Sequence, residues 1–203
     1  MPTQANALRG LIDQDRAAVL ATVELASRIE LSDLARPTPC GDWSLADLLA
    51  HLTGQQRGFA AAARGAGAEL RRWLPVRAAD PVLDYLAGCV EVLQAFADPA
   101  VADQDFALPE LRAGRGFPAG QAISFHLVDN AVHAWDLAAC LGIPLQLNDE
   151  LLQAALRVAE RVPDGAERTE PGAAFAPGRP VPAGAGPLER MLVLLGRSPS
   201  WPD

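Results

Sequence analysis

The chain has 203 residues, of which 50% are apolar and 21% are charged, and it carries a formal net charge of -8 with a pI of about 4.9. These values are typical of one globular domain that is long enough to bury a core. Every basic residue is an arginine, and the arginines are scattered along the chain, so a nucleic-acid-binding face is not expected. No apolar run approaches the ~18 residues of a membrane span, and the first residues lack the layout of a signal peptide, so the cytoplasm is the expected location.

The three cysteines, Cys40, Cys89 and Cys140, lie far apart in the sequence. An odd number without close spacing argues against a disulfide framework and against a cysteine-type zinc site. We therefore expect each to pack as a small apolar side chain. Cys40 falls in a predicted loop and is the one cysteine that we regard as open to reaction.

The first predicted helix spans residues 5–31, where apolar residues recur at helical spacing. Asp15 falls in the middle of that apolar stripe. Either Asp15 has a partner in the interior, or the helix is rotated about its axis at this point so that Asp15 leaves the buried face. We favour the rotation.

Two further helices of the N-terminal half have clear start signals. The second predicted helix spans residues 44–64, where Ser44 can cap the first turn after a break that contains proline and glycine. The third spans residues 81–97, with Asp80 as N-cap and Pro81 at the first helical position.

Residues 98–118 show no regular period and contain several prolines and glycines. A loop of this length is unusual in a compact domain and is often functional. Arg112 and Arg115 lie in it and are candidates to receive an anionic thiol or substrate. The fourth predicted helix follows over residues 119–141 and is stopped by Gly142.

Two shorter helices are predicted at 149–161 and 187–196, separated by a stretch rich in Pro, Gly and Ala (163–187) that we expect to form an irregular wrap. No convincing strand pattern is present, apart from a few residues near Phe175 or Val181. The predicted class is all-α: a single domain in which a four-helix bundle carries C-terminal additions.

The fourth predicted helix carries four ionisable residues on one face: His126, Asp129, His133 and Asp136. At ~100° per residue they fall within about 80° of the helix circumference. The rest of this helix is apolar, apart from Asn130 beside the stripe. Such a helix is typically buried, so the stripe is expected to face a cavity or the bundle interior.

Buried carboxylates and imidazoles are costly unless they are paired, hydrogen-bonded or bound to a metal. Asp129 and His133 are four residues apart, so their tips can meet at one divalent ion. His51, on the second predicted helix, is the expected third ligand, and Gln55 lies one turn further along the same edge. The alternative is a buried polar network without metal, in which Asp129 and His133 form an ion pair. We favour the metal.

Three segments of the sequence resemble one known family. TPCGDWSLADLLAHLTG is similar to the segment that opens the second helix of the mycothiol-dependent maleylpyruvate isomerase N-terminal-domain family, within the DinB-like superfamily. LVDNAVHAWDLAACLG resembles the fourth-helix motif of that family, an acidic residue four before a histidine and then a Trp-Asp pair. LERMLVLLGRSPSW is similar to the ending of short, mostly uncharacterised actinobacterial members.

The resemblance implies an up-down-down-up four-helix bundle with a divalent metal at one end, held by His51, Asp129 and His133. Zinc is the favoured ion, with nickel and iron as alternatives. The spacing argument adds His126 as pocket wall or weaker fourth ligand, and Asp136 as an acceptor that orients a ligand ring. Two departures are visible: Asp stands where the family has Glu, and only about 60 residues follow the fourth helix, where the characterised isomerase has a second domain. The second argues against maleylpyruvate itself as the substrate.

The function implied by the resemblance is a metal- and thiol-dependent S-transferase or isomerase, in which a low-molecular-weight thiol such as mycothiol attacks an electrophile. The expected partners are therefore small molecules, and precedent in the superfamily is compatible with a homodimer. A non-catalytic metal-binding bundle with a structural or sensory role is the alternative. A non-haem iron centre ranks lower, because nothing in the sequence indicates a 2-oxo-acid site.

Overall fold

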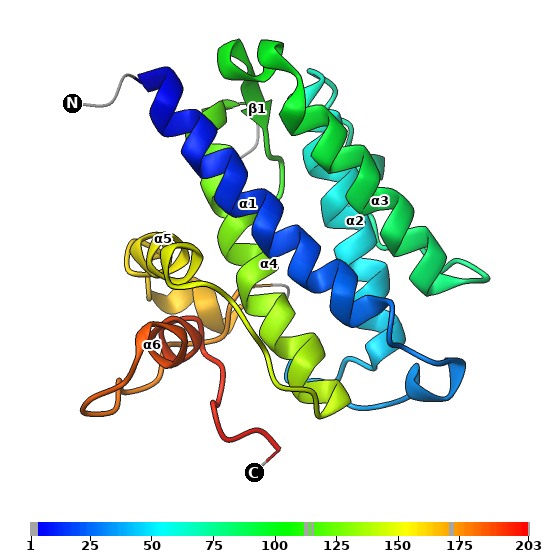
Figure 1. Ribbon diagram of the computed structural model, residues 1–203, viewed down its shortest axis with the longest axis vertical. Helices are drawn as coiled ribbons and strands as arrows, with labels where there is room; N and C mark the ends of the chain where they lie inside the picture. The colour runs from blue at the N-terminus through cyan, green and yellow to red at the C-terminus, as the bar shows by residue number, and fades with distance from the viewer. Residues whose placement is uncertain (1–3, 112–113, 115, 171–172, 203) are drawn as a thin grey trace.

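The structure is a computed structural model that describes residues 4–111, 114, 116–170 and 173–202. Four long helices form a bundle (Figure 1): α1 (Gln4–Ala26), α2 (Leu45–Ala63), α3 (Pro81–Ala97) and α4 (Ala119–Leu141). Among the described residues, none of the helices combines the length and the hydropathy of a membrane span. The prediction of an all-α class is confirmed.

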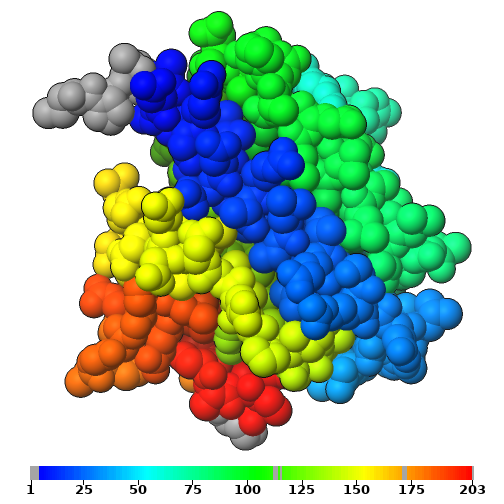
Figure 2. All heavy atoms as spheres, viewed as in Figure 1, coloured from blue at the N-terminus to red at the C-terminus, as the bar shows by residue number. Residues whose placement is uncertain are grey.

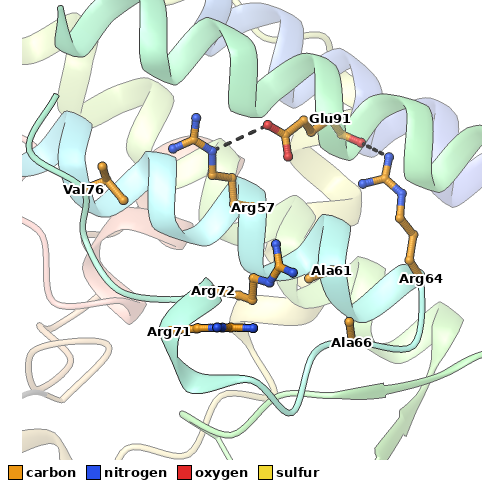
Figure 3. A pocket seen from close by; sticks show the side chains of 8 residues that line it. All are labelled: Arg57, Ala61, Arg64, Ala66, Arg71, Arg72, Val76 and Glu91. Atoms are coloured by element: carbon orange, nitrogen blue, oxygen red, sulfur yellow. Dashed lines mark hydrogen bonds and ion pairs between the residues drawn. The ribbon is translucent and has the colours of Figure 1, made fainter. Parts of the chain in front are cut away.

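The helix directions follow from side-chain contacts between neighbours. Arg57 of α2 pairs with Asp84 of α3. Arg64, further along α2, donates to the backbone carbonyl of Glu91, further along α3 (Figure 3), so α2 and α3 run parallel. Figure 1 shows α1 and α4 running together in the opposite direction. The chain thus has the expected up-down-down-up order.

The first helix ends at Ala26, so the expected range of 5–31 is too long at its C-terminal end. The backbone amides of Arg28 and Ile29 bond to carbonyls three residues back, which tightens the last turn. A short 3-10 helix, η1 (Leu31–Asp33), follows instead of a further α-helical turn. Apolar residues past Ala26 still pack on the core from this loop, which is why the sequence pattern continued beyond the helix.

The segment between α3 and α4 is more ordered than a loop. A 3-10 helix, η3 (Pro99–Asp103), leads into an antiparallel pair of strands, β1 (Asp105–Ala107) and β2 (Gly116–Pro118). Phe106 of β1 is fully buried in the core. The strand is three residues long, too short to show an alternating pattern in sequence.

The expectation of strand residues near Phe175 or Val181 is wrong, because both lie in irregular backbone. This C-terminal part contains α5 (Asp149–Ala159), the 3-10 helix η4 (Ala166–Thr169) and α6 (Pro187–Leu194). Figure 2 shows its yellow, orange and red residues gathered on one side of the bundle, beside α1.

A buried arginine holds the irregular C-terminal wrap together. Arg168 is 6% exposed. Its guanidinium donates to four backbone carbonyls, those of Val162, Pro163, Ala176 and Leu194. Three of these carbonyls lie in irregular backbone, and that of Leu194 lies at the C-terminal end of α6, where helix carbonyls have no partner within the helix, so one side chain takes the place of a hydrogen-bond ladder.

Candidate metal centre

The expected ligand residues come together between α2 and α4. One ligand atom from each of His51, Asp129 and His133 lies within 4.8 Å of the other two. The two histidines face each other across the interface, with ring centroids 5.5 Å apart. The antiparallel packing of α2 against α4 thus brings residues 51 and 133 to the same level of the bundle.

Asp129 has an acceptor atom that no described side chain or backbone group uses. Its Oδ1 lies 3.4 Å from Nε2 of His133. Its Oδ2 is buried and receives no hydrogen bond from any described residue. A buried carboxylate oxygen without a donor is costly, and a cation at this position would remove the cost.

His51 is held in a neutral form that suits a metal ligand. Burial and the neighbouring His133 lower the pKa of His51 to about 4, against a weaker opposing effect of Asp129. The indole of Trp43 covers one side of the imidazole, with ring centroids 4.9 Å apart. A neutral imidazole keeps a lone pair available near pH 7.

His133 and Asp129 lie within ion-pair distance, with Nε2 3.4 Å from Oδ1. Burial lowers the pKa of His133, but the charge of Asp129 and hydrogen bonds to Asp129 and Asp136 outweigh it, so the pKa lies well above its ordinary value. Burial raises the pKa of Asp129, but the charge of His133, its hydrogen bond and the nearby imidazoles together outweigh burial, so the pKa of Asp129 is lowered. Metal binding would therefore have to displace a proton from His133.

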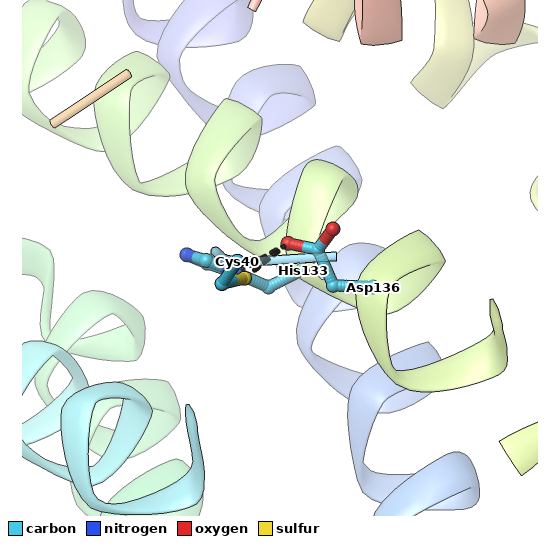
Figure 4. Close-up of side chains that lie close together, drawn as sticks. All are labelled: Cys40, His133 and Asp136. Atoms are coloured by element: carbon cyan, nitrogen blue, oxygen red, sulfur yellow. Dashed lines mark hydrogen bonds and ion pairs between the residues drawn. The ribbon is translucent and has the colours of Figure 1, made fainter. Parts of the chain in front are cut away.

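His133 also belongs to a second group of possible metal ligands, with Cys40 and Asp136. The Sγ atom of Cys40, from the loop before α2, lies 3.1 Å from Oδ2 of Asp136, and the same carboxylate oxygen lies 2.9 Å from Nδ1 of His133 (Figure 4). Single ligand atoms of Cys40, His133 and Asp136 also lie within 4.8 Å of one another.

Arg197 distinguishes the two groups. Its Nε and Nη2 atoms donate to the two oxygens of Asp136 at 2.9 Å each, and Nη2 also lies 3.5 Å from Sγ of Cys40. Burial raises the pKa of Asp136, but bonds from His133 and the charge of Arg197 reverse this and lower it to about 2. The Asp136 carboxylate is thus already neutralised, whereas one oxygen of Asp129 accepts no hydrogen bond within the described ranges.

These contacts favour a metal held by His51, Asp129 and His133. In that arrangement Nε2 of His133, which lies beside Asp129, would be the ligand atom, while its Nδ1 lies 2.9 Å from Asp136. A carboxylate that accepts from the distal nitrogen of a metal-bound histidine is the usual support for such a ligand.

His126 belongs to a different cluster, in the core. Its Nδ1 lies 2.7 Å from Asp15 of α1 and its Nε2 lies 2.9 Å from Gln56 of α2. Gln56 in turn donates to Asn130. All four side chains are fully buried. His126 thus lies outside both groups of possible metal ligands found among the described residues. Asp15 has a buried partner, so the interpretation that α1 is simply rotated at Asp15 is wrong.

The other expected site residues divide into two kinds. Gln55 is 8% exposed and donates from Nε2 to Glu110 of the segment before β2, at 2.9 Å. Arg112 and Arg115 lie outside the described residues.

Sequence reasoning missed Cys40 and Arg197 as parts of this centre. Cys40 lies inside the TPCGDWS segment that resembles the family, so a signal for it was present. Arg197 lies 61 positions beyond Asp136, in a segment whose packing no local pattern indicates.

Comparisons with known proteins agree with this fold. The structure is similar to the crystal structure of the mycothiol-dependent maleylpyruvate isomerase, with a TM-score of 0.60 at 13% identity, over 85% of this chain and 81% of that chain. Since the bundle ends at Leu141, a match of this extent continues into the C-terminal helices. The protein is thus an all-α, DinB-like four-helix bundle with added C-terminal helices.

The sequence comparisons define the family. The model of the mycothiol maleylpyruvate isomerase N-terminal domain matches residues 16–138, and the chain belongs to this family. Uncharacterized proteins from two strains of Mycobacterium tuberculosis are 31% identical over 179 residues, which cover 88% of this chain and 92% of theirs.

Proposed function

We propose that the chain is a divalent-metal- and low-molecular-weight-thiol-dependent S-transferase or isomerase. The observation that carries the proposal is the convergence of His51, Asp129 and His133 beside a buried carboxylate oxygen that accepts no hydrogen bond from the described residues. Two imidazoles and one carboxylate suit zinc first, and nickel or iron next. When bound, such an ion would favour the thiolate form of a small thiol at neutral pH.

The side chains around these ligands have distinct proposed roles. Asp136, fixed by Arg197, orients the ring of His133. Trp43 is 38% exposed and covers His51, so it would limit the access of water from that side. The nucleophile comes from the cosubstrate, so no serine or cysteine of the chain has to attack.

The identity of the thiol is proposed from the family. The similar crystal structure is that of a mycothiol-dependent enzyme, which makes mycothiol the first thiol to test. Arg112 and Arg115 remain proposed as groups that receive the anionic part of the thiol or the substrate.

Metal content in three proteins tests the centre. Protein purified without a histidine tag should contain one divalent ion per chain. His51→Ala should lose the ion, because His51 is a proposed ligand in the group with Asp129 and His133. It takes no part in the alternative group of Cys40, His133 and Asp136. Cys40→Ser is the matched control and should keep the ion. Wild-type protein that contains less than about a tenth of an equivalent of metal, and takes up no added zinc or nickel, would refute the proposed metal site.

Thiol-dependent chemistry is tested separately. Wild-type protein should accelerate the reaction of mycothiol with the electrophile monobromobimane, and His51→Ala should show only the spontaneous rate. Metal binding without any dependence of the rate on thiol would instead support a structural or sensory metal, as in the non-catalytic alternative.

A further inference from the structure

Four arginines gather at a cavity on the side of α2 that faces away from the metal centre. The cavity has a volume of about 670 Å³ and lies between α2, α3 and the 3-10 helix η2 (Leu70–Arg72). Figure 3 shows the side chains of Arg57, Arg64, Arg71 and Arg72 around it, with Glu91 on the α3 side. Volumes of this size are ordinary for small-molecule sites.

The cavity is separate from the candidate metal centre. His51 faces α4, where it contacts His133, whereas Arg57 faces α3, where it pairs with Asp84. At ~100° per residue, Arg57 and Arg64 lie about 120° or more around α2 from His51. A ligand in one site therefore does not occupy the other.

Arg57 is the structural member of the four arginines. Its two terminal nitrogens donate to the two oxygens of Asp84, at 3.1 and 2.7 Å. Its Nε lies 3.6 Å from Glu91. Each of the three nitrogens of this guanidinium thus lies beside a carboxylate of α3, which fixes its position.

The other three arginines keep unused donors. Arg64 donates only from Nη2, to the backbone carbonyl of Glu91 at 3.2 Å, among the described residues. Arg71 and Arg72 both donate to a single oxygen of Glu69, and Arg72 uses only Nε in the described part of the chain. Each guanidinium has five N–H donors, so several remain available to a ligand.

The charge at the cavity has the sign opposite to that of the whole protein. The chain carries a net charge of -8, yet within the described part of the chain the ion pairs of these four arginines involve three acidic residues, Glu69, Asp84 and Glu91. Two guanidiniums that share one carboxylate oxygen are incompletely neutralised. The cavity thus offers positive charge and directed donors together.

We propose that this cavity binds a small organic polyanion of the phosphate-ester or polycarboxylate class. Its oxyanion groups would accept from Arg64, Arg71 and Arg72, since the guanidinium fork matches such groups with two parallel bonds. Its organic part would pack against Val76 and the alanines of the cavity wall. The site is distinct from the proposed metal chemistry and does not depend on it.

Calorimetric titration with two probes tests the site. Phenyl phosphate represents phosphate esters and tricarballylate represents polycarboxylates, and both chelate divalent metals weakly. Wild-type protein at low ionic strength should bind at least one probe saturably, one molecule per chain. Tighter binding of phenyl phosphate assigns the phosphate-ester class, and tighter binding of tricarballylate assigns the polycarboxylate class.

Matched double variants locate the binding. Arg64→Ala with Arg72→Ala removes two exposed arginines of the cavity and should weaken binding at least about tenfold, because charge-assisted hydrogen bonds are lost. Arg28→Ala with Arg190→Ala removes two exposed arginines elsewhere, which pair with Glu24 and Glu160, and should leave affinity within about twofold.

Three results would overturn the proposal. The first is the absence of saturable binding of either probe to wild-type protein. The second is an equal loss of affinity in the two double variants, which would indicate diffuse attraction by net charge. The third is loss of probe binding in His51→Ala, which would place the anion at the metal centre.

Discussion

The carboxylate of Asp136 and the guanidinium of Arg197 form a two-pronged ion pair, with both hydrogen bonds at 2.9 Å. Asp136 lies on α4 and Arg197 follows α6, and neither side chain is more than slightly exposed. The same carboxylate contacts Nδ1 of His133. The C-terminal segment thus fixes the ring orientation of a proposed metal ligand that lies on the bundle.

Arg197→Ala should lower the free energy of unfolding by about 3–5 kcal/mol, because the buried carboxylate of Asp136 loses the guanidinium that donates to both of its oxygens. Arg190→Ala removes an arginine from an exposed pair with Glu160 and should cost at most about 1 kcal/mol. Urea unfolding of both variants gives the comparison. Arg197→Ala should also bind metal about tenfold more weakly, since the acceptor of His133 is no longer held in place. Equal stability losses in the two variants would contradict the role of the buried pair.

Metal binding should release a proton near neutral pH. The pKa of His133 is raised above its ordinary value in the metal-free protein, so the imidazole is protonated there, and a metal must displace that proton. His51, with a pKa of about 4, contributes no proton at pH 7. The affinity for metal should therefore rise with pH until His133 deprotonates. Zinc titration calorimetry in buffers of different ionisation enthalpy measures the release, and a heat that does not vary with the buffer would refute it.

Substitutions of Asp15 and His126 should have strongly coupled effects on the free energy of unfolding, and they should leave the metal content unchanged. Burial raises the pKa of Asp15, with the charge and hydrogen bond of His126 opposing it, so the pair is the costly centre of a core network. Asp15→Ala should cost about 3–5 kcal/mol, because His126 loses its buried partner. A double-mutant cycle with His126→Phe should show a coupling of about 1–3 kcal/mol.

Asp15→Asn is the control for that interpretation. It retains a side-chain oxygen that can accept from His126, so it should cost less than Asp15→Ala. Its metal content should equal that of wild-type protein, since Asp15 lies outside the ligand group. Loss of metal in Asp15→Asn would mean that the core network supports the metal centre after all.

Two helical glycines should respond to alanine in opposite ways. A Cβ atom at Gly54 would lie 2.7 Å from the backbone oxygen of Trp73 and 2.9 Å from that of Leu74, so Gly54→Ala must push this segment away from α2. We expect a loss of about 1–3 kcal/mol. Gly10, in α1, has nothing within 4 Å of the corresponding position, so Gly10→Ala should stabilise by about 0.5–1 kcal/mol through helix propensity. Thermal unfolding of both variants checks the pair, and stabilisation by Gly54→Ala would contradict the close approach.

The helices of the bundle were predictable because their signals are local. Ser44 caps α2 by accepting from the amide of Asp47, Pro81 opens α3, and Gly142 ends α4 in the left-handed conformation. Each of these signals acts within one helical turn. The end of α1 was misjudged for the same reason, since apolar spacing continues past Ala26 into a loop that packs on the core.

The sequence by itself determined which helix carries an ionisable face and that Asp129 and His133 lie one turn apart on it, because a helix converts spacing into direction. Only the tertiary structure decided which of the neighbouring residues meet them. In the folded chain His51 and Cys40 lie beside His133, and Arg197 forms an ion pair with Asp136. His126 instead contacts Asp15 in the core. These pairings depend on the level at which one helix packs against another and on where the C-terminal segment returns, and no periodicity along one chain segment encodes either.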